Sequence, residues 1–141
     1  MWAQALSDDG LDLRGDARAL VTLDASWEGT IVEGPSMFAH GGKHFLFYSG
    51  NWYDSDRYAI GYATCDGPLG PCVKATTKAP LFASTGGALG PGGQEIFTDA
   101  RGATWLAYHA WTSPRASYAA GGARSLRLSP IDLASGVPAL R

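Results

Sequence analysis

The sequence predicts an all-β fold made of short antiparallel strands joined by tight turns. Its 141 residues include 19 glycines and 8 prolines, only 17% of them are charged, and 11% are aromatic. Glycine and proline punctuate turns, whereas aromatic residues are enriched in strands. The chain also repeats itself, because Phe38 lies 59 residues before Phe97 and Tyr48 lies 60 residues before Tyr108. Units of about four strands that recur at such a period are typical of β-propeller blades.

Residues 1–26 are predicted to form the outer half of one blade. Residues 2–7 have the composition of a strand, Asp8-Asp9-Gly10 is a hairpin turn signal, and residues 11–13 alternate like a returning strand. Only Met1 precedes this hairpin. Because a two-stranded hairpin is marginally stable by itself, we expect the chain to open in the middle of a sheet.

Residues 27–84 are predicted to form a fuller blade. An apolar strand ends near Phe38, and a polar turn at residues 40–43 joins it to the run Phe45-Leu46-Phe47-Tyr48. Residues 51–56 form a polar and aromatic loop, and residues 58–63 return as the third strand. A short outer strand is expected from Val73 onward.

Cys65 and Cys72 flank the turn Gly67-Pro68-Leu69-Gly70-Pro71 that follows this third strand. A disulfide closing so short a loop would staple the hairpin and would suit a secreted protein. Two reduced cysteines in a turn fit the sequence nearly as well, so both alternatives stay open.

Residues 85–141 are predicted to form the next blade. The loop Gly90-Pro91-Gly92-Gly93 precedes a strand, and residues 105–108 align with residues 45–48. Residues 126–129 match residues 60–63 and also residues 3–6. We therefore expect residues 1–141 to be a single incomplete propeller domain of about two and a half blades, each full blade a four-stranded antiparallel sheet.

Charge and hydropathy exclude several function classes. The formal net charge of −2 offers no basic face, so we expect neither a nucleic-acid partner nor an acidic membrane. The sequence contains no run of about 18 apolar residues that would predict a membrane span. The N-terminus lacks a charged segment followed by an apolar region, so no signal peptide is expected in this chain, and its localisation stays open.

Glu33 is the candidate catalytic residue. The step Gly34-Pro35 directly follows it and predicts a turn, since proline fixes its own φ and glycine permits unusual values. We therefore expect Glu33 on a bend between two strands, partly desolvated by apolar neighbours. Desolvation raises the pKa of a carboxyl group and suits it to donate a proton near neutral pH. The alternative is a solvated loop glutamate.

The chain resembles the C-terminal part of proteins of glycoside hydrolase family 43, five-bladed β-propeller enzymes that include arabinanases, α-L-arabinofuranosidases and β-xylosidases. The resemblance covers nearly the whole chain, and its motifs follow the order found in the family. These motifs are Val32-Glu33-Gly34-Pro35, Phe47-Tyr48-Ser49-Gly50 with the strand at residues 58–63, the turn at residues 67–71, Gly90-Pro91-Gly92 before Phe97-Thr98-Asp99, Tyr108-His109-Ala110-Trp111, and Gly122-Ala123-Arg124.

The resemblance implies inverting hydrolysis of α-L-arabinofuranosyl or β-D-xylosyl linkages in plant polysaccharides, with Glu33 as the general acid. Enzymes of the family use one aspartate to activate water and a second to orient the acid. Both precede the glutamate, yet the aspartates before Glu33 fit neither role because they lie in turns or on an outer strand. They are Asp8, Asp9, Asp12, Asp16 and Asp24. We therefore expect a fragment that lacks the catalytic base and is inactive alone.

Four residues are candidates for substrate binding: Arg124, Trp52, Tyr53 and Gln94. Arg124 matches an arginine that contacts the sugar from the last blade in the family, and its alternative is a surface arginine. The rings of Trp52 and Tyr53 suit the apolar faces of sugars, with core packing as the alternative. For Trp105 and Trp111 we expect core packing.

We expect no cofactor. The resemblance allows a central calcium held with the help of a histidine that ends the Gly-Pro-Gly loop, but here Gly93 takes that place and Gln94 follows. Calcium prefers several oxygen ligands, and no run of carboxylates supplies them.

Two other functions stay open. A non-catalytic carbohydrate-binding or assembly module would need Trp52 or Arg124 but not Glu33, and a fructan-cleaving relative would keep the fold with another substrate. In each case the expected partner is an oligosaccharide or polysaccharide. Unpaired strand edges at both ends of an incomplete propeller also predict self-association.

Overall fold

The computed structural model describes residues 1–141 and contains ten β-strands and one short 3-10 helix. The elements are β1 (Trp2–Leu6), β2 (Leu13–Ala19), η1 (Ser26–Glu28), β3 (Val32–His40), β4 (Lys43–Gly50), β5 (Ala59–Cys65), β6 (Cys72–Lys74), β7 (Ala88–Thr98), β8 (Thr104–Thr112), β9 (Arg124–Asp132) and β10 (Ala139–Leu140). None of its helices has the length and hydropathy needed to cross a bilayer.

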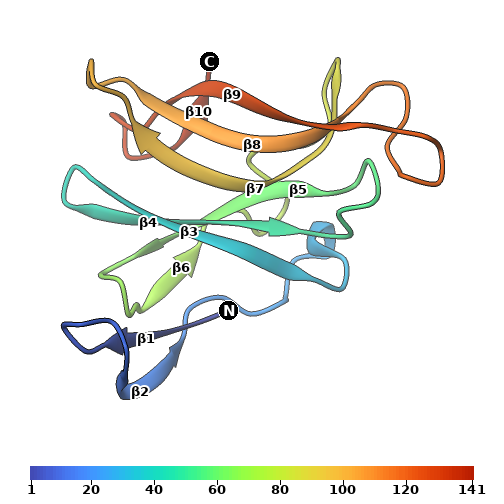
Figure 1. Ribbon diagram of the computed structural model, residues 1–141. Helices are drawn as coiled ribbons and strands as arrows, with labels where there is room; N and C mark the ends of the chain where they lie inside the picture. Colours follow the sequence, from blue (N-terminus) through green and yellow to red (C-terminus); the bar gives the residue numbers. More distant parts are fainter.

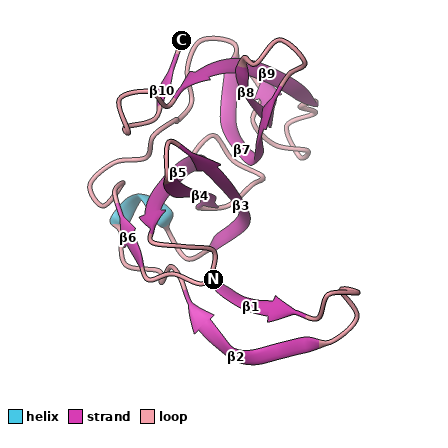
Figure 2. Ribbon diagram, turned by 90° about the vertical axis from the view of Figure 1, so that its left-hand side faces the viewer, coloured by secondary structure: helices cyan, strands magenta, loops and turns pink.

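The strands form three antiparallel sheets that follow one another along the chain. The hairpin β1-β2 is one sheet, β3-β4-β5-β6 is the second, and β7-β8-β9-β10 is the third. Figure 1 shows them layered from the N-terminal hairpin to the C-terminal sheet, and Figure 2 shows the same order after a quarter turn. The prediction of an all-β fold with about two and a half propeller blades is confirmed.

The internal repeat in the sequence corresponds to the strand register. Phe38 pairs with Phe45 in the middle sheet, and Phe97 pairs with Trp105 at the equivalent position of the C-terminal sheet. Each four-stranded sheet is therefore the same supersecondary unit.

Strand β4 explains why the middle sheet holds the molecule together. Phe45 and Phe47 belong to the core shared with the C-terminal sheet, whereas Leu46 and Tyr48 belong to a second core beneath the N-terminal segment. Successive strand residues point to opposite faces, so an uninterrupted apolar run predicts a strand that is covered on both sides. All four side chains are at most 1% exposed.

The outer two layers each leave an apolar face open. Leu126 and Leu128 of β9 are 77% and 54% exposed, and Trp2 and Leu13 of the hairpin are 71% and 67% exposed. A contiguous exposed apolar surface commonly marks a place where another layer packs.

The structure corrects one prediction, the start of the second strand, and resolves one open alternative, the state of the two cysteines. The returning strand begins at Leu13 rather than at residue 11, because the Asp9 carboxylate accepts hydrogen bonds from the Ser7 hydroxyl and the Leu11 amide and so keeps the turn open until Asp12. Cys65 and Cys72 are register partners in β5 and β6, and they form a disulfide.

The segment that enters the middle sheet is fixed by a buried ion pair. Glu28 is fully buried, and its Oε1 accepts hydrogen bonds from Lys74 at 2.6 Å and from the Tyr48 hydroxyl at 2.8 Å. Its Oε2 accepts from the backbone amides of Asp24 and Ala25. Burial alone would raise the pKa of this carboxyl, but the hydrogen bonds outweigh it and hold the pKa below its ordinary value.

Replacing Glu28 with glutamine is expected to destabilise the fold by about 3–5 kcal/mol, because the Lys74 ammonium loses the buried one of its two carboxylate partners. The matched control is Asp24→Asn, since Asp24 pairs with the same lysine but its side chain is 58% exposed. Urea denaturation monitored by tryptophan fluorescence measures both variants at neutral pH.

The pH dependence of the free energy of unfolding gives a second test of Glu28→Gln. Because the pKa of Glu28 is lower in the folded state than its ordinary value of 4.5, the pair contributes stability above that pH, and the contribution fades as pH falls through the folded-state pKa. The difference between wild type and Glu28→Gln therefore shrinks in acid, and a difference that stays constant with pH would contradict this role.

Candidate active site

Glu33 is the second residue of β3 and lies beside a break in the strand register. Pairing of β3 with β4 is regular up to Glu33 opposite Ser49 and resumes only at Ser36 opposite Phe47. Gly34 has a φ of 60°, and Pro35 has no amide hydrogen to donate. These residues therefore form a bulge inside one strand, which corrects the predicted bend between two strands. The bulge turns the Glu33 side chain to an exposed position, whereas the sequence predicted partial burial.

The hydroxyl of Tyr58 binds the Glu33 carboxylate. Tyr58 lies just before β5, is 3% exposed, and donates from Oη to Glu33 Oε1 at 2.7 Å. Burial raises the pKa of Tyr58, and the neighbouring carboxylate raises it further. The phenol therefore stays protonated across the working pH range and acts as a hydrogen-bond donor.

Two consecutive glycines of β7 make room for the rings around the acid. A β-carbon on Gly92 would overlap the Tyr58 ring, and one on Gly93 would lie 2.5 Å from Nε2 of His109. The two rings stack with an interplanar angle of 2° and centroids 5.8 Å apart. The backbone of β7 thus lies so close to Tyr58 and His109 that no side chain fits between them.

Gln94 lies beneath the bulge and is 4% exposed. Its Nε2 donates to the Gly34 carbonyl at 2.7 Å, and its Oε1 accepts from the Ser49 hydroxyl at the same distance. The Ser49 oxygen accepts in turn from the Gly93 amide. Gln94 therefore ties the innermost strands β3 and β7 together directly behind Glu33.

His109 of β8 contacts both Tyr58 and Arg124 of β9. An Nη of Arg124 lies 2.7 Å from Nδ1 of His109. Burial and the adjacent guanidinium both lower the pKa of His109, so its ring is neutral at neutral pH, and the same Arg124 nitrogen also contacts Nε2 of the ring. Arg124 is the register partner of Trp111, which lies two residues beyond His109 on the same face of β8. Arg124 and His109 together form one wall near Glu33.

Aromatic side chains complete this wall. The Arg124 guanidinium lies over the rings of Tyr53 and Trp111, 5.0 and 5.5 Å from their centroids. Trp111 is fully buried and donates from Nε1 to the Tyr53 carbonyl at 2.9 Å. Trp52 stands beside Tyr53, with ring centroids 5.0 Å apart, and is 52% exposed. The wall therefore offers a cation and an exposed aromatic face to a ligand.

Comparisons with known proteins agree with this geometry. The model of the family described as "Glycosyl hydrolases family 43" matches residues 1–138. The chain belongs to glycoside hydrolase family 43. It is similar to a thermostable family-43 glycoside hydrolase of known structure, with 30% identity and a TM-score of 0.88 over 99% of this chain and 46% of that one.

The chain is also similar to two further proteins. An endo-1,4-β-xylanase from Bacteroides thetaiotaomicron VPI-5482 is 28% identical, with a TM-score of 0.85 over 99% of this chain and 49% of that one. The β-D-galactofuranosidase xynD of Aspergillus niger is 31% identical over 113 residues, which are 77% of this chain and 31% of that protein. This family 43 chain therefore spans half or less of the length of these relatives.

The structure brings three of the predicted site residues together at one end of the sheets. Arg124, Tyr53 and Trp52 share the wall beside Glu33, whereas Gln94 lies behind it with both ends of its amide hydrogen-bonded. Trp111, expected in the core, is buried and also supports Arg124 from below.

Sequence reasoning missed Tyr58 and His109. Both stand within motifs that carry the family 43 resemblance, but neither residue type signals a role without its partner. The signal that was available is Gly92-Gly93, since two adjacent glycines inside a strand mark a close approach of other groups.

The residues present do not fit a calcium held by the Gly-Pro-Gly loop. The space beside Gly93 is filled by His109, and the Arg124 guanidinium on that imidazole repels a cation. No three His, Cys, Asp or Glu side chains of the chain are grouped closely enough to hold a metal ion.

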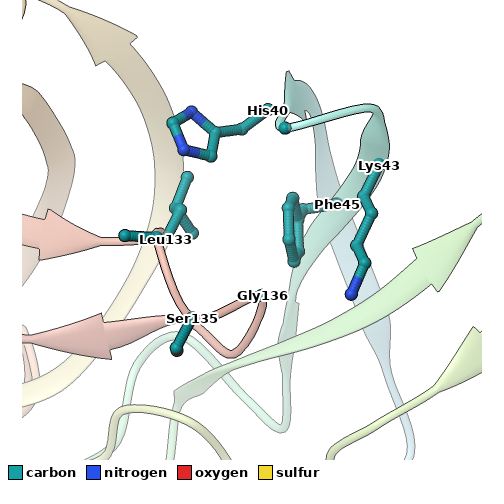
Figure 3. Close-up of a pocket in the computed structure, with 8 residues that line it drawn as sticks. His40, Lys43, Phe45, Leu133, Ser135 and Gly136 are labelled. Atoms are coloured by element: carbon teal, nitrogen blue, oxygen red, sulfur yellow. The ribbon is translucent and has the colours of Figure 1, made fainter.

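A cavity of about 170 Å³ lies at the far end of β3, between the β3-β4 turn and the loop after β9. Figure 3 shows His40, Lys43 and Phe45 on one side and Leu133, Ser135 and Gly136 on the other. His40 is seven residues from Glu33 along the strand, roughly 23 Å at the rise of a β-strand. The cavity has no carboxylate in its lining and lies apart from Glu33.

Replacing Gly92 with alanine is expected to destabilise the chain by about 1–3 kcal/mol, because the new methyl group overlaps the buried Tyr58 ring. Gly87→Ala is the matched control, since a β-carbon there meets nothing within 4 Å. Thermal unfolding followed by circular dichroism compares the two, and equal melting temperatures would contradict the close approach.

Proposed function

We propose that this chain supplies the acid-bearing part of an inverting glycoside hydrolase that cleaves α-L-arabinofuranosyl or β-D-xylosyl linkages. The observation that carries the proposal is the exposed Glu33 carboxyl, hydrogen-bonded by Tyr58 and flanked by a wall of Arg124, Tyr53 and Trp52. Such a wall suits a sugar, whose hydroxyls accept from a guanidinium and whose apolar face stacks on an aromatic ring.

Glu33 acts as the general acid in this proposal. It protonates the glycosidic oxygen as the bond to the anomeric carbon breaks, while water attacks from the opposite side. Inverting enzymes place the carboxylate that activates this water about 6.5–9.5 Å from the acid.

Asp54, in the loop that carries Trp52 and Tyr53, is engaged in holding the fold, because its carboxylate accepts a hydrogen bond from the Tyr118 amide. We therefore propose that the base belongs to a further part of the enzyme, and that the chain alone does not hydrolyse glycosides.

The relatives support a furanoside or xylan-type substrate. One is named an endo-1,4-β-xylanase, and another is named a β-D-galactofuranosidase. Five-membered sugar rings and xylopyranosides are compact, and the wall offers one exposed aromatic ring and one guanidinium to either.

The open faces of the outer sheets fit the same proposal. We assign residues 27–84 and 85–141 to one blade each and residues 1–26 to the outer half of another. Leu126 and Leu128 on one side and Trp2 on the other would pack against further blades, and in their absence the free edges and apolar faces promote self-association.

A chimera tests the proposed function. The part of the thermostable family-43 hydrolase that this chain does not cover is fused in front of it, and 4-nitrophenyl α-L-arabinofuranoside and β-D-xylopyranoside are the substrates. We expect no turnover from the 141-residue chain, turnover from the chimera, and loss of about 100-fold or more in kcat for Glu33→Gln, the scale of a removed general acid.

The matched control is Glu95→Gln, which removes an exposed carboxylate of β7 outside the wall. We also expect the chain alone to sediment as associated species and the chimera as a monomer. Turnover by the isolated chain that disappears in Glu33→Gln, or a chimera unaffected by that change, would overturn the proposal.

A further inference from the structure

We propose that Tyr58 is a positioning residue that selects which oxygen of Glu33 delivers the proton. The inference rests on the proposed role of Glu33 as general acid and adds a residue to it. Tyr58 occupies Oε1, which leaves Oε2 to carry the acidic proton.

The hydrogen bond has a fixed direction. The Tyr58 hydroxyl donates to Oε1 at 2.7 Å, and burial of the phenol beside a carboxylate keeps it protonated. The oxygen that accepts this hydrogen bond acts as the carbonyl oxygen of the neutral carboxylic acid. The proton of the neutral acid therefore sits on the other oxygen.

The reaction step balances on this arrangement. The O–H bond at Oε2 breaks as a new O–H bond forms on the glycosidic oxygen, and the electron pair of the bond to the anomeric carbon passes to that oxygen. Water supplies the new bond to carbon, and its proton goes to the carboxylate base outside this chain. Glu33 is left as a carboxylate, to which the Tyr58 hydrogen bond is stronger than to the neutral acid.

The ring of Tyr58 is held on two sides, which gives the hydroxyl a fixed position. Gly92 lies against one part of the ring, and the imidazole of His109 stacks on it with an interplanar angle of 2°. His109 is in turn held by Arg124. His109 therefore contacts both Arg124, the proposed sugar ligand, and Tyr58, which donates to Glu33.

Packing alone does not account for a tyrosine at this position. A phenylalanine fills the same space between Gly92 and His109, and the middle sheet uses phenylalanine at Phe45 and Phe47 for that purpose. The hydroxyl adds only the contact with Glu33 and its neighbour Ser49. The hydroxyl group is therefore the part of Tyr58 that acts on the site.

Nuclear magnetic resonance of the 141-residue chain tests the contact without any need for turnover. The chain contains three glutamates, Glu28, Glu33 and Glu95, so isotope-labelled glutamate gives three carboxyl signals. In Tyr58→Phe we expect the Glu33 signal to move and its side chain to become mobile, while the signals of Glu28 and Glu95 stay in place.

Tyr62→Phe is the matched control, because Tyr62 is a buried tyrosine of the same sheet that packs on Phe45 and Phe47 and does not contact Glu33. Gly92→Ala, which displaces the Tyr58 ring, is expected to move the Glu33 signal as Tyr58→Phe does. A Glu33 signal that is the same in wild type and in Tyr58→Phe overturns the inference.

The chimera adds a kinetic reading. We expect Tyr58→Phe to lower kcat about tenfold with KM nearly unchanged, since one hydrogen bond orients the acid and not the sugar. A fall in kcat/KM caused by KM alone would assign Tyr58 to substrate binding and contradict the inference. If the wild-type chimera is inactive, the proposed function fails, and the resonance experiment still decides whether Tyr58 positions Glu33.

Discussion

The arrangement of the site depends on how closely the backbone of β7 approaches two aromatic rings. Gly92 and Gly93 leave no side chain between that strand and the rings of Tyr58 and His109. Any larger residue would separate the inner strands of the two four-stranded sheets. Because interior packing tolerates little change in volume, this contact fixes the distance between the sheets at the end where Glu33 lies.

The other side-chain contacts at this end of the sheets are arranged around the approach of β7 to the two rings. Tyr58, just before β5, contacts Glu33 on β3, and His109 of β8 contacts Arg124 on β9, so residues of both four-stranded sheets meet at this end. Gln94 bridges the bulge of β3 to β7 behind the acid. On the opposite side of the middle sheet, the buried Glu28 and Lys74 anchor the segment that leads into β3.

The sequence predicts the fold well where the pattern is periodic. The run from Phe45 to Tyr48 is apolar at every position, and such a run between turn signals fits a strand covered on both faces. The repeat of about 60 residues then places the second copy of the same unit, and the paired registers agree. Glu33 could be singled out because the Gly-Pro step after it predicts a bend and because it stands in a motif that resembles family 43.

The features that the sequence mispredicted or missed are those set by contacts between residues distant in sequence. Gly34 and Pro35 are compatible with both a turn and a bulge, and only the pairing of β3 with β4 selects the bulge. The contact of Tyr58 with Glu33 spans 25 residues, and that of His109 with Arg124 spans 15, so no local pattern shows either. The choice between a disulfide and two reduced cysteines at Cys65 and Cys72 likewise depended on their being register partners in β5 and β6, which the sequence alone does not show.

The central claim is that a sugar binds this chain at the Glu33 end of the sheets. The five tryptophans give five indole N–H signals in an isotope-labelled sample, and they report on separate regions of the chain. Titration with xylohexaose or arabinohexaose is predicted to move the signals of Trp52 and Trp111, which line or support the wall. The signals of Trp2 and Trp105, which lie away from it, are predicted to stay in place. Movement of Trp2 or Trp105 with Trp52 unchanged would contradict the account.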